Sequence, residues 1–222
     1  GEIDLGLAGP IVTMIAIVAG MNAFNMIDGI DGLLAVFLMN SLIFLLIVSV
    51  GFGPLFVLLL SLVGIFFIAN LGVRLKGEHR QIFMGDSGSI TFGFLIVCLI
   101  VKLSQGAHQE IRPVAALWII AIPLMDFVAI MIRRLRKGQS LMKADREHLH
   151  HIFQRLGFSS FQTLLIICGI ATAYAAFGIY GEMVNIPEYV MFYLFITCFL
   201  IYAALLSNVW KVSTKIREWR GL

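Results

Sequence analysis

No charged side chain interrupts residues 33–73, which read LLAVFLMNSLIFLLIVSVGFGPLFVLLLSLVGIFFIANLGV. A membrane helix needs about 20 apolar residues, so this run of 41 residues is long enough to cross a bilayer twice. The sequence GFGP at 51–54 contains helix-breaking residues and predicts the turn between the two helices. Because a helix satisfies its own backbone groups in lipid, the stretch predicts a polytopic membrane protein of the all-α class.

The rest of the chain has the same character. Its 222 residues are 60% hydrophobic and only 13% charged, with a mean hydropathy of +0.97. Soluble domains are about half apolar and a quarter charged. Further apolar runs, one of them interrupted by Asp126, occupy residues 5–27, 87–101, 113–132, 156–181 and 189–210. We therefore expect a single transmembrane domain over residues 1–222, with about seven membrane helices.

Basic side chains predict how these helices are oriented. Apart from Lys102 and Arg112, the 16 Lys and Arg residues fall in alternate loops and so on one side of the membrane. Loops rich in Lys and Arg stay in the cytoplasm. The pattern predicts cytoplasmic loops at 74–88 and 133–160, with the N-terminus outside and the C-terminus in the cytoplasm.

A polar segment, MNAFNMIDGIDG at residues 21–32, comes directly before the long apolar run. Asn22 and Asn25 are three residues apart, as are Asp28 and Asp31, so helical geometry would put each pair on one face. Carboxylates at a membrane edge are costly to desolvate unless a charge or a hydrogen bond meets them. The segment predicts a ligand or ion site; the alternative is a polar turn that caps the next helix.

A second polar segment, FMGDSGS at residues 83–89, lies at the start of an apolar run. A carboxylate such as Asp86 is a hard oxygen ligand for Mg²⁺ or Mn²⁺, and a helix N-terminus suits phosphate. The alternative is that Asp86, Ser87 or Ser89 simply caps the helix. Phe83 is either an interfacial anchor or a platform for a base.

A third polar segment contains His148, His150 and His151. No cysteine or further ligand at a typical spacing supports a closed zinc site, so phosphate binding is the favoured interpretation. The basic run 133–137 is typical of a stop-transfer flank, some of whose charges could face an anionic headgroup or nucleotide. Asp126 is the only ionisable residue well inside a predicted span. It could hydrogen-bond neighbouring helices, and together with Trp118 and Pro123 it indicates a break in the helix.

All three polar segments are predicted at one membrane surface. A transporter would instead bury its polar residues near the bilayer midplane. Phosphoryl transfer between a nucleotide diphosphate and a lipid needs a divalent ion, cationic donors and little covalent machinery. The sequence therefore favours an enzyme of that type.

Four segments carry a resemblance that spans essentially the whole chain: residues 22–33, 83–88, 117–138 and 148–151. Through them the chain resembles the polyprenyl-phosphate N-acetylhexosamine-1-phosphate transferases. The resemblance implies transfer of N-acetylglucosamine 1-phosphate from UDP-N-acetylglucosamine to undecaprenyl phosphate, releasing UMP. It also implies an active site on the cytoplasmic face of the bacterial inner membrane and a role in starting a cell-surface polysaccharide such as the O-antigen of lipopolysaccharide. It is compatible with a homodimer and implies no nucleic-acid partner.

The resemblance also implies roles for individual residues. Asp86 would hold Mg²⁺ or Mn²⁺ on the diphosphate, with Asn25 beside it, and His148 would complete the catalytic group. The remaining substrate-binding residues would be Asn22 and Asp28 in the same cleft, Asp31 and Phe83 at the uracil, and Arg134, His150 and His151 at the phosphates or sugar.

One departure from the family pattern stands out. Members carry an Asp-Asp-x-x-Asp motif on an earlier cytoplasmic loop, whereas this sequence contains no Asp-Asp pair. Members also have further spans before the point that corresponds to Gly1, so we expect the chain to be the C-terminal part of a longer enzyme. The alternatives are a phospho-MurNAc-pentapeptide transferase-type enzyme, a catalytically incomplete membrane fragment that binds or assembles, and a small-solute transporter.

Overall fold

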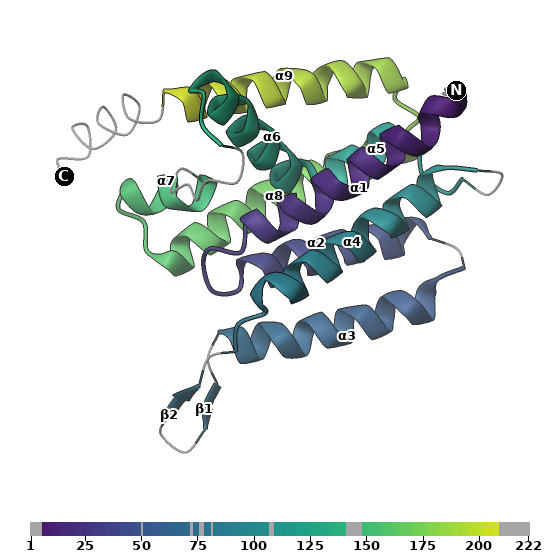
Figure 1. Ribbon diagram of the computed structural model, residues 1–222. Coiled ribbons are helices and arrows are strands. Elements are labelled where there is room, and N and C mark those ends of the chain that lie inside the picture. The colour runs from purple at the N-terminus through teal and green to yellow at the C-terminus, as the bar shows by residue number, and fades with distance from the viewer. Residues whose placement is uncertain are drawn as a thin grey trace.

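The computed structural model describes residues 6–49, 51–71, 73–75, 78–80, 82–106, 109–140 and 148–208, and these are predominantly helical. After a 3₁₀ turn at Gly6–Ala8, the helices are α1 (Gly9–Met26), α2 (Leu33–Val48), α3 (Gly53–Asn70), α4 (Gly85–Ser104), α5 (Pro113–Ile119), α6 (Ala121–Arg136), α7 (Leu149–Arg155), α8 (Ser160–Met183) and α9 (Glu188–Ser207). A small antiparallel hairpin of β1 (Val73–Leu75) and β2 (Glu78–Arg80) projects from the bundle (Figure 1). The all-α prediction is confirmed, with this hairpin as an addition.

The described helices that are long and apolar enough to cross a membrane number five, or six if α5 and α6 form one bent span. The prediction of about seven is not confirmed. The difference is α2, which has 16 residues. It begins only after Gly32, whose φ of +81° is left-handed, and it ends at the extended Ser49. The polar 27–32 segment and the turn near 51–54 therefore take up residues that a longer span would need.

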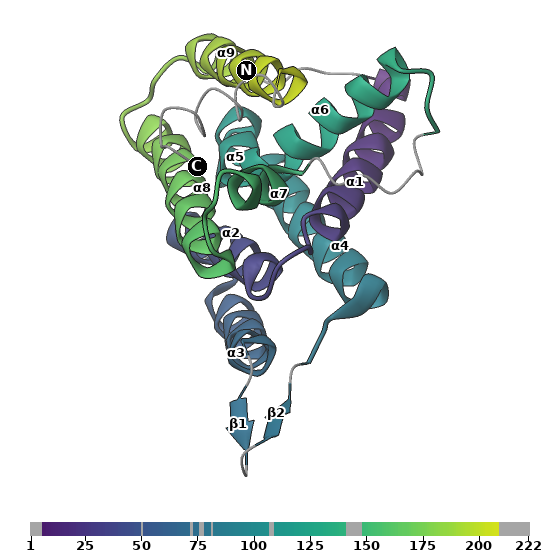
Figure 2. The same cartoon turned by 90° about the vertical axis from the view of Figure 1, so that its left-hand side faces the viewer.

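The predicted break near Asp126 is confirmed. Helices α5 and α6 meet at Ile120 and are bent by 84° relative to each other. Trp118 holds α5 against α8, because its ring centroid lies 4.5 Å from that of Phe177 and 5.5 Å from that of Tyr174. The bend directs α6 away from the line of α5 (Figures 1 and 2).

Helix α2 lies at the centre of the bundle, between α3, α4 and α8 (Figure 2). Its apolar side chains Leu34, Leu38 and Leu42 are almost fully buried. Helices α1 and α4 pack closely, since a Cβ added at Gly20 would lie 2.3 Å from Cγ2 of Val97. These contacts fix the end of α1 relative to the start of α4.

The outer faces of the bundle are apolar as well as exposed, on α1, α3 and α9 in particular. Such surfaces are expected of helices that face lipid.

At one end of the bundle, Arg112 donates from Nε to Oε2 of Glu182 (2.9 Å) and from its two terminal nitrogens to the carbonyls of Gly181 and Ile186 (both 2.8 Å). At the other end lie the α1–α2 connection, the start of α4, α7 and the start of α8 (Figure 1).

Candidate active site

The first part of the site is a side-chain junction between α1 and α4. The amide nitrogen of Asn25, in the last turn of α1, donates to Ser89 Oγ at 2.8 Å and to Asp86 Oδ1 at 3.3 Å. Ser89 is completely buried, and the single proton of its hydroxyl is shared between the backbone carbonyls of Gly85 and Asp86, which lie 3.2 and 3.1 Å away. Asn25 thus fixes the Asp86 carboxylate at the head of a helix long enough to span a membrane.

The alternative in which Asp86, Ser87 or Ser89 caps α4 is wrong. The N-cap is Met84, and no side chain caps this helix. The helix begins at Gly85, whose φ of +68° is a conformation that glycine adopts without strain. The Asp86 carboxylate is therefore left at the surface in the first turn, close to the free N–H groups of the helix.

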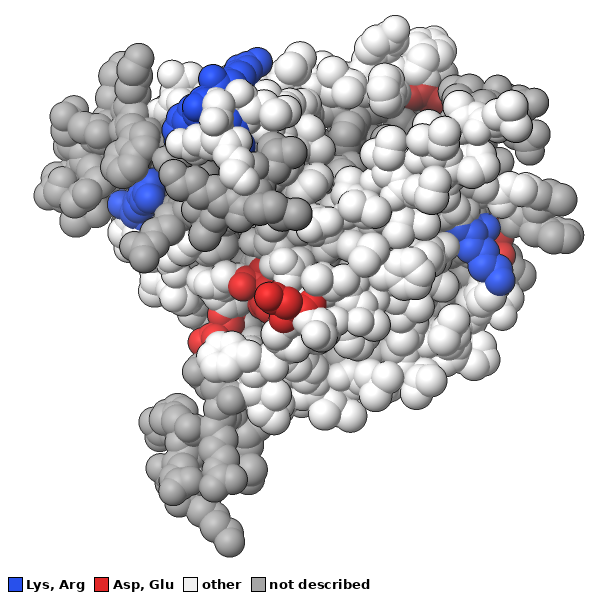
Figure 3. Space-filling view, in the orientation of Figure 1, with Lys and Arg blue, Asp and Glu red and all other residues white. Residues whose placement is uncertain are grey.

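Asp28 lies close enough to two other carboxylates, those of Asp86 and Asp31, for their charges to act on it. Partial desolvation raises the pKa of Asp28 above its usual 3.8, and the negative charges of Asp86 and Asp31 raise it further. Acidic side chains gather on this face of the molecule, near the start of α4 (Figure 3). Mutual repulsion of this kind is what a bound cation would relieve.

The 27–32 segment that carries Asp28 and Asp31 is not helical. Asn22 and Asn25 do share a helix, as their spacing predicted, but the two aspartates lie in the connection between α1 and α2. Gly32 ends this connection in a left-handed conformation that a helix cannot contain. The aspartates nevertheless remain close enough for the charge of Asp31 to affect Asp28.

The donor set suits a magnesium-type ion better than zinc. Over the described ranges, no group of three or more His, Cys, Asp or Glu side chains is arranged to hold a metal. Mg²⁺ commonly takes only one or two carboxylates and keeps substrate phosphates in its shell. Asp86 with a neighbouring aspartate would fit that requirement, whereas a closed zinc site needs four protein ligands.

Sequence reasoning missed Asn70, the last residue of α3. Its side-chain oxygen accepts from the Gly32 backbone N–H, and its amide nitrogen donates to the Ile82 carbonyl at 2.9 Å. Asn70 therefore connects the end of the 27–32 segment to the residues that lead into α4. The one signal in the sequence was an isolated amide at the end of a long apolar run, which does not reveal these distant partners.

The second part of the site is the histidine segment. His148 immediately precedes α7, and its Nδ1 lies 2.9 Å from Oδ2 of Asp126 on α6. The other oxygen of Asp126 accepts from the Leu149 backbone N–H at 3.3 Å and from the hydroxyl of Tyr202 on α9. The prediction that Asp126 hydrogen-bonds neighbouring helices is confirmed.

His150 joins the two parts of the site. Its imidazole packs on Gly29, where an added Cβ would lie 2.1 Å from Nε2. The residue is 2% exposed, and no described group forms a hydrogen bond with Nε2. The pKa of His150 is lowered from 6.5 to about 4. Burial is the largest cause, and the nearby His151 and His148 add to it, so this ring is neutral at pH 7.

The three imidazoles are close together. The rings of His148 and His150 are parallel, with centroids 5.7 Å apart, and the centroids of His150 and His151 are 4.2 Å apart. The predicted histidine and aspartate segments, more than 100 residues apart in sequence, thus meet at Gly29.

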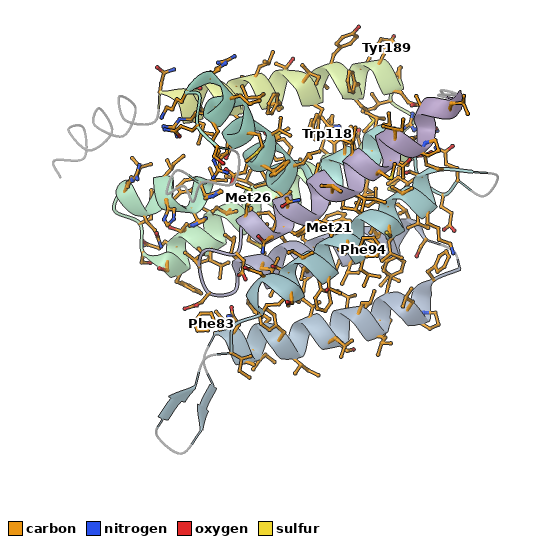
Figure 4. All side chains as sticks on the ribbon, viewed as in Figure 1. Met21, Met26, Phe83, Phe94, Trp118 and Tyr189 are labelled. Atoms are coloured by element: carbon orange, nitrogen blue, oxygen red, sulfur yellow. The ribbon has the colours of Figure 1, made fainter. Side chains whose placement is uncertain are left out.

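The structure also describes three other predicted residues. The Asn22 amide donates to the Val18 carbonyl at 2.7 Å, one turn earlier in its own helix. Phe83 is 69% exposed and points out of the bundle beside the start of α4 (Figure 4). Arg134 is buried in the last turn of α6.

Known proteins are similar in sequence to this chain. Residues 1–104 match the family model described as glycosyl transferase family 4. A relative from Yersinia pestis named undecaprenyl-phosphate alpha-N-acetylglucosaminyl 1-phosphate transferase is 41% identical over 99% of this chain and 61% of its own length. Proteins of the same name from Escherichia coli K12 and Pasteurella multocida are 40% identical over 98% of this chain and 60% of their own length, and 43% identical over 70% and 43%, respectively.

The chain spans about three fifths of the length of the Yersinia and Escherichia relatives. The match to them runs through both parts of the site, since it covers nearly all of this chain. Over residues 1–104 the chain thus matches glycosyl transferase family 4, and over nearly its whole length it is similar to these relatives.

Proposed function

We propose that the protein provides the active site for transfer of N-acetylglucosamine 1-phosphate from UDP-N-acetylglucosamine to undecaprenyl phosphate. The observation that carries the proposal is the Asn25–Asp86 contact, which fixes a carboxylate at the head of a membrane helix, where its charge acts on Asp28. The names of the relatives supply the donor sugar and the lipid acceptor.

The reaction exchanges one diphosphate linkage for another. An oxygen of the lipid phosphate attacks the sugar-bearing phosphorus of the donor. A phosphorus–oxygen bond to the lipid forms, the bond to the bridging oxygen breaks, and that oxygen leaves with UMP. Since the bonds made and broken are of one kind, the reaction is expected to be readily reversible.

Asp86 would hold the metal ion, Mg²⁺ or Mn²⁺, with Asp28 close enough to share it. When bound, such an ion neutralises charge on the diphosphate and polarises the phosphorus under attack. Asn25 keeps the Asp86 carboxylate oriented, and Ser89 in turn holds Asn25. The acidic cluster needs such a counter-charge, because its members repel one another.

The remaining residues would bind the substrates. His148 and His151 would meet the phosphates, with Arg134 contributing positive charge. Asp31 and Phe83 would contact the uracil, and Asn22 would line the cleft from α1. His150 is buried against Gly29, so its contribution would be to hold the 27–32 segment as well as to face the substrate.

The same proposal includes a location. The site end of the bundle would lie at the cytoplasmic surface of the bacterial inner membrane, because the predicted cytoplasmic loops carry most of the basic residues. The apolar outer faces of the helices would leave the polyprenyl chain in the bilayer while its phosphate reaches Asp86. The product would start a cell-surface polysaccharide.

The proposal is tested by UMP release. The protein is purified in detergent and given UDP-N-acetylglucosamine, undecaprenyl phosphate and Mg²⁺. Turnover is expected, and both EDTA and Asp86→Asn should abolish it. Glu188→Gln, a matched loss of a carboxylate at the opposite end of the bundle, should leave it unchanged.

If the chain shows no turnover, a chimera is assayed in which the preceding residues of the Escherichia coli relative are joined to Gly1. An active chimera would show that the proposed site works once those residues are present. A well-folded chimera without activity would overturn the proposal.

A further inference from the structure

Asp126 is a buried acid with an unusual set of partners. It is 1% exposed and lies on α6, less than two turns beyond the 84° bend. A buried carboxylate is costly unless hydrogen-bond donors meet it. The described donors are His148 Nδ1, the Leu149 N–H and the Tyr202 hydroxyl, from the α7 segment and from α9.

The two oxygens of this carboxylate have different partners. Oδ1 accepts from both Leu149 and Tyr202, whereas Oδ2 faces His148. The bonds to Oδ1 fix the plane of the carboxylate, so Oδ2 points at one nitrogen of one histidine. An ionised carboxylate only accepts hydrogen bonds, so with Asp126 in that form the partner atom Nδ1 of His148 would carry the proton.

We infer that Asp126 is a positioning residue that holds His148 in the Nδ1–H tautomer and directs its Nε2 toward the substrate phosphates. The inference rests on the proposed function for the identity of the substrate. Asp126 itself touches neither substrate nor metal in this arrangement; it acts through His148. Tyr202 supports it by fixing the carboxylate.

The surroundings of the ring agree with a fixed orientation. The His148 ring lies parallel to that of His150, with centroids 5.7 Å apart, and His150 is itself held against Gly29. The His150 ring therefore lies between the 27–32 segment and His148, so the position of this segment affects that of the His148 ring. Asp126 fixes the same ring from the opposite element, α6, so the ring has little freedom to turn.

The bend between α5 and α6 explains how an acid within an apolar sequence reaches this place. Pro123 and Asp126 are both in the first two turns of α6, directly after the break. Ile130, one turn further along, packs in a cluster that includes Ile152 of α7 and Tyr202 of α9. The bend thus sets α6 against the two elements that supply the donors to Asp126.

The first test reads the tautomer. Histidine labelled with ¹⁵N, with His148 assigned by loss of its signals in His148→Ala, should show a protonated Nδ1 and an unprotonated Nε2 in the wild type at neutral pH. Asp126→Asn keeps the shape but supplies an amide that can donate to Nδ1, so the proton should move to Nε2. An unchanged tautomer in Asp126→Asn would overturn the inference.

The second test uses kinetics in a double-mutant cycle. Loss of the acid that orients a catalytic histidine lowers kcat by about 10²- to 10⁴-fold in known enzymes, and a loss in that range is expected for Asp126→Asn with little change in KM. In the His148→Ala background, Asp126→Asn should cost no further activity. Equal losses in both backgrounds would show that Asp126 is merely structural.

Tyr202→Phe provides a second variant should Asp126→Asn fail to fold. It removes one donor but keeps the carboxylate, so it should retain the Nδ1–H tautomer and lower kcat by less than tenfold, an effect again absent in the His148→Ala background. A reversed tautomer in Tyr202→Phe would contradict the inference. The tautomer measurement needs no turnover, so an inactive wild type would count against the proposed function and still leave this inference to be decided.

Discussion

The amide nitrogen of Asn25 lies 3.3 Å from a carboxylate oxygen of Asp86, and this contact joins the last turn of α1 to the first turn of α4. The two residues are 61 positions apart in sequence. The contact brings a neutral donor to a carboxylate whose negative charge acts on Asp28. Its removal should therefore affect both stability and cation binding.

Asn25→Asp should destabilise the protein by about 1 to 2 kcal/mol in metal-free buffer, because a donor to Asp86 becomes a fourth carboxylate. Millimolar Mg²⁺ should restore most of the loss, since a cation relieves the repulsion. The melting temperature in detergent, with and without Mg²⁺, measures both effects. Asn22→Asp is the matched control on the same helix, and its amide bonds only to the Val18 carbonyl among the described residues. Equal Mg²⁺ responses in the two variants would contradict the assigned role of Asn25.

Gly29→Ala should dislodge His150, because the new Cβ would lie 2.1 Å from Nε2 of that ring. Overpacking of this kind costs about 1 to 3 kcal/mol, and loss of UDP-N-acetylglucosamine affinity should accompany it. Gly64→Ala is the control, since a Cβ there meets nothing within 4 Å. Thermal unfolding and nucleotide binding by calorimetry measure the outcome. A Gly29→Ala protein that is as stable as Gly64→Ala would show that the ring has room to move.

Asn70→Ala should loosen the 27–32 segment, because it removes the bonds to Gly32 and Ile82 and leaves both backbone groups without this partner. The expected loss of stability is about 2 kcal/mol, since each hydrogen bond contributes about 1 kcal/mol. Hydrogen exchange should speed up in residues 27–32 and 82–84 but not at the Arg112–Glu182 contact at the other end of the bundle. Uniform acceleration at both ends would indicate global destabilisation instead.

Acid should destabilise the protein partly through His150. The pKa of this residue is lowered to about 4 in the folded protein, against 6.5 in the unfolded chain. The neutral His150 ring makes its full contribution to the free energy of unfolding above pH 6.5. As the pH falls toward 4 this contribution is lost, which lowers the free energy of unfolding by up to about 3 kcal/mol. Asp28 acts in the opposite direction, because its raised pKa lets protonation relieve repulsion.

The contribution of His150 is isolated by comparing the wild type with His150→Gln, in which the effect of Asp28 cancels. The melting temperature of the wild type should fall more steeply between pH 6.5 and 4. Parallel profiles for the two proteins would show that His150 is not held neutral by the fold.

The sequence predicted the helices and the break near Asp126 because apolar runs and a proline are local signals. It did not predict that α2 would be short: this helix begins at Leu33, where the apolar run begins, but it ends at Val48, before the GFGP turn is reached. The helical face proposed for Asp28 and Asp31 failed because Gly32 adopts a left-handed conformation and its backbone N–H bonds to a distant partner, Asn70.

The candidate site was predicted in part. The segments with Asn25, Asp86 and His150 were identified individually, and the structure brings them together through contacts of long sequence separation. The pairing of Asp126 with His148 could not be read from the sequence, because it depends on the direction in which the 84° bend sends α6.

The most direct test of the central claim follows the donor phosphorus. UDP-N-acetylglucosamine labelled with ³²P in the β-phosphate is incubated with the protein, undecaprenyl phosphate and Mg²⁺, and the organic and aqueous phases are separated. The account predicts that the label enters the lipid phase while unlabelled UMP appears in the aqueous phase, and that Asp86→Asn abolishes both. Label that stays in the aqueous phase as UDP while sugar enters the lipid would show that the sugar alone is transferred, and would contradict the account.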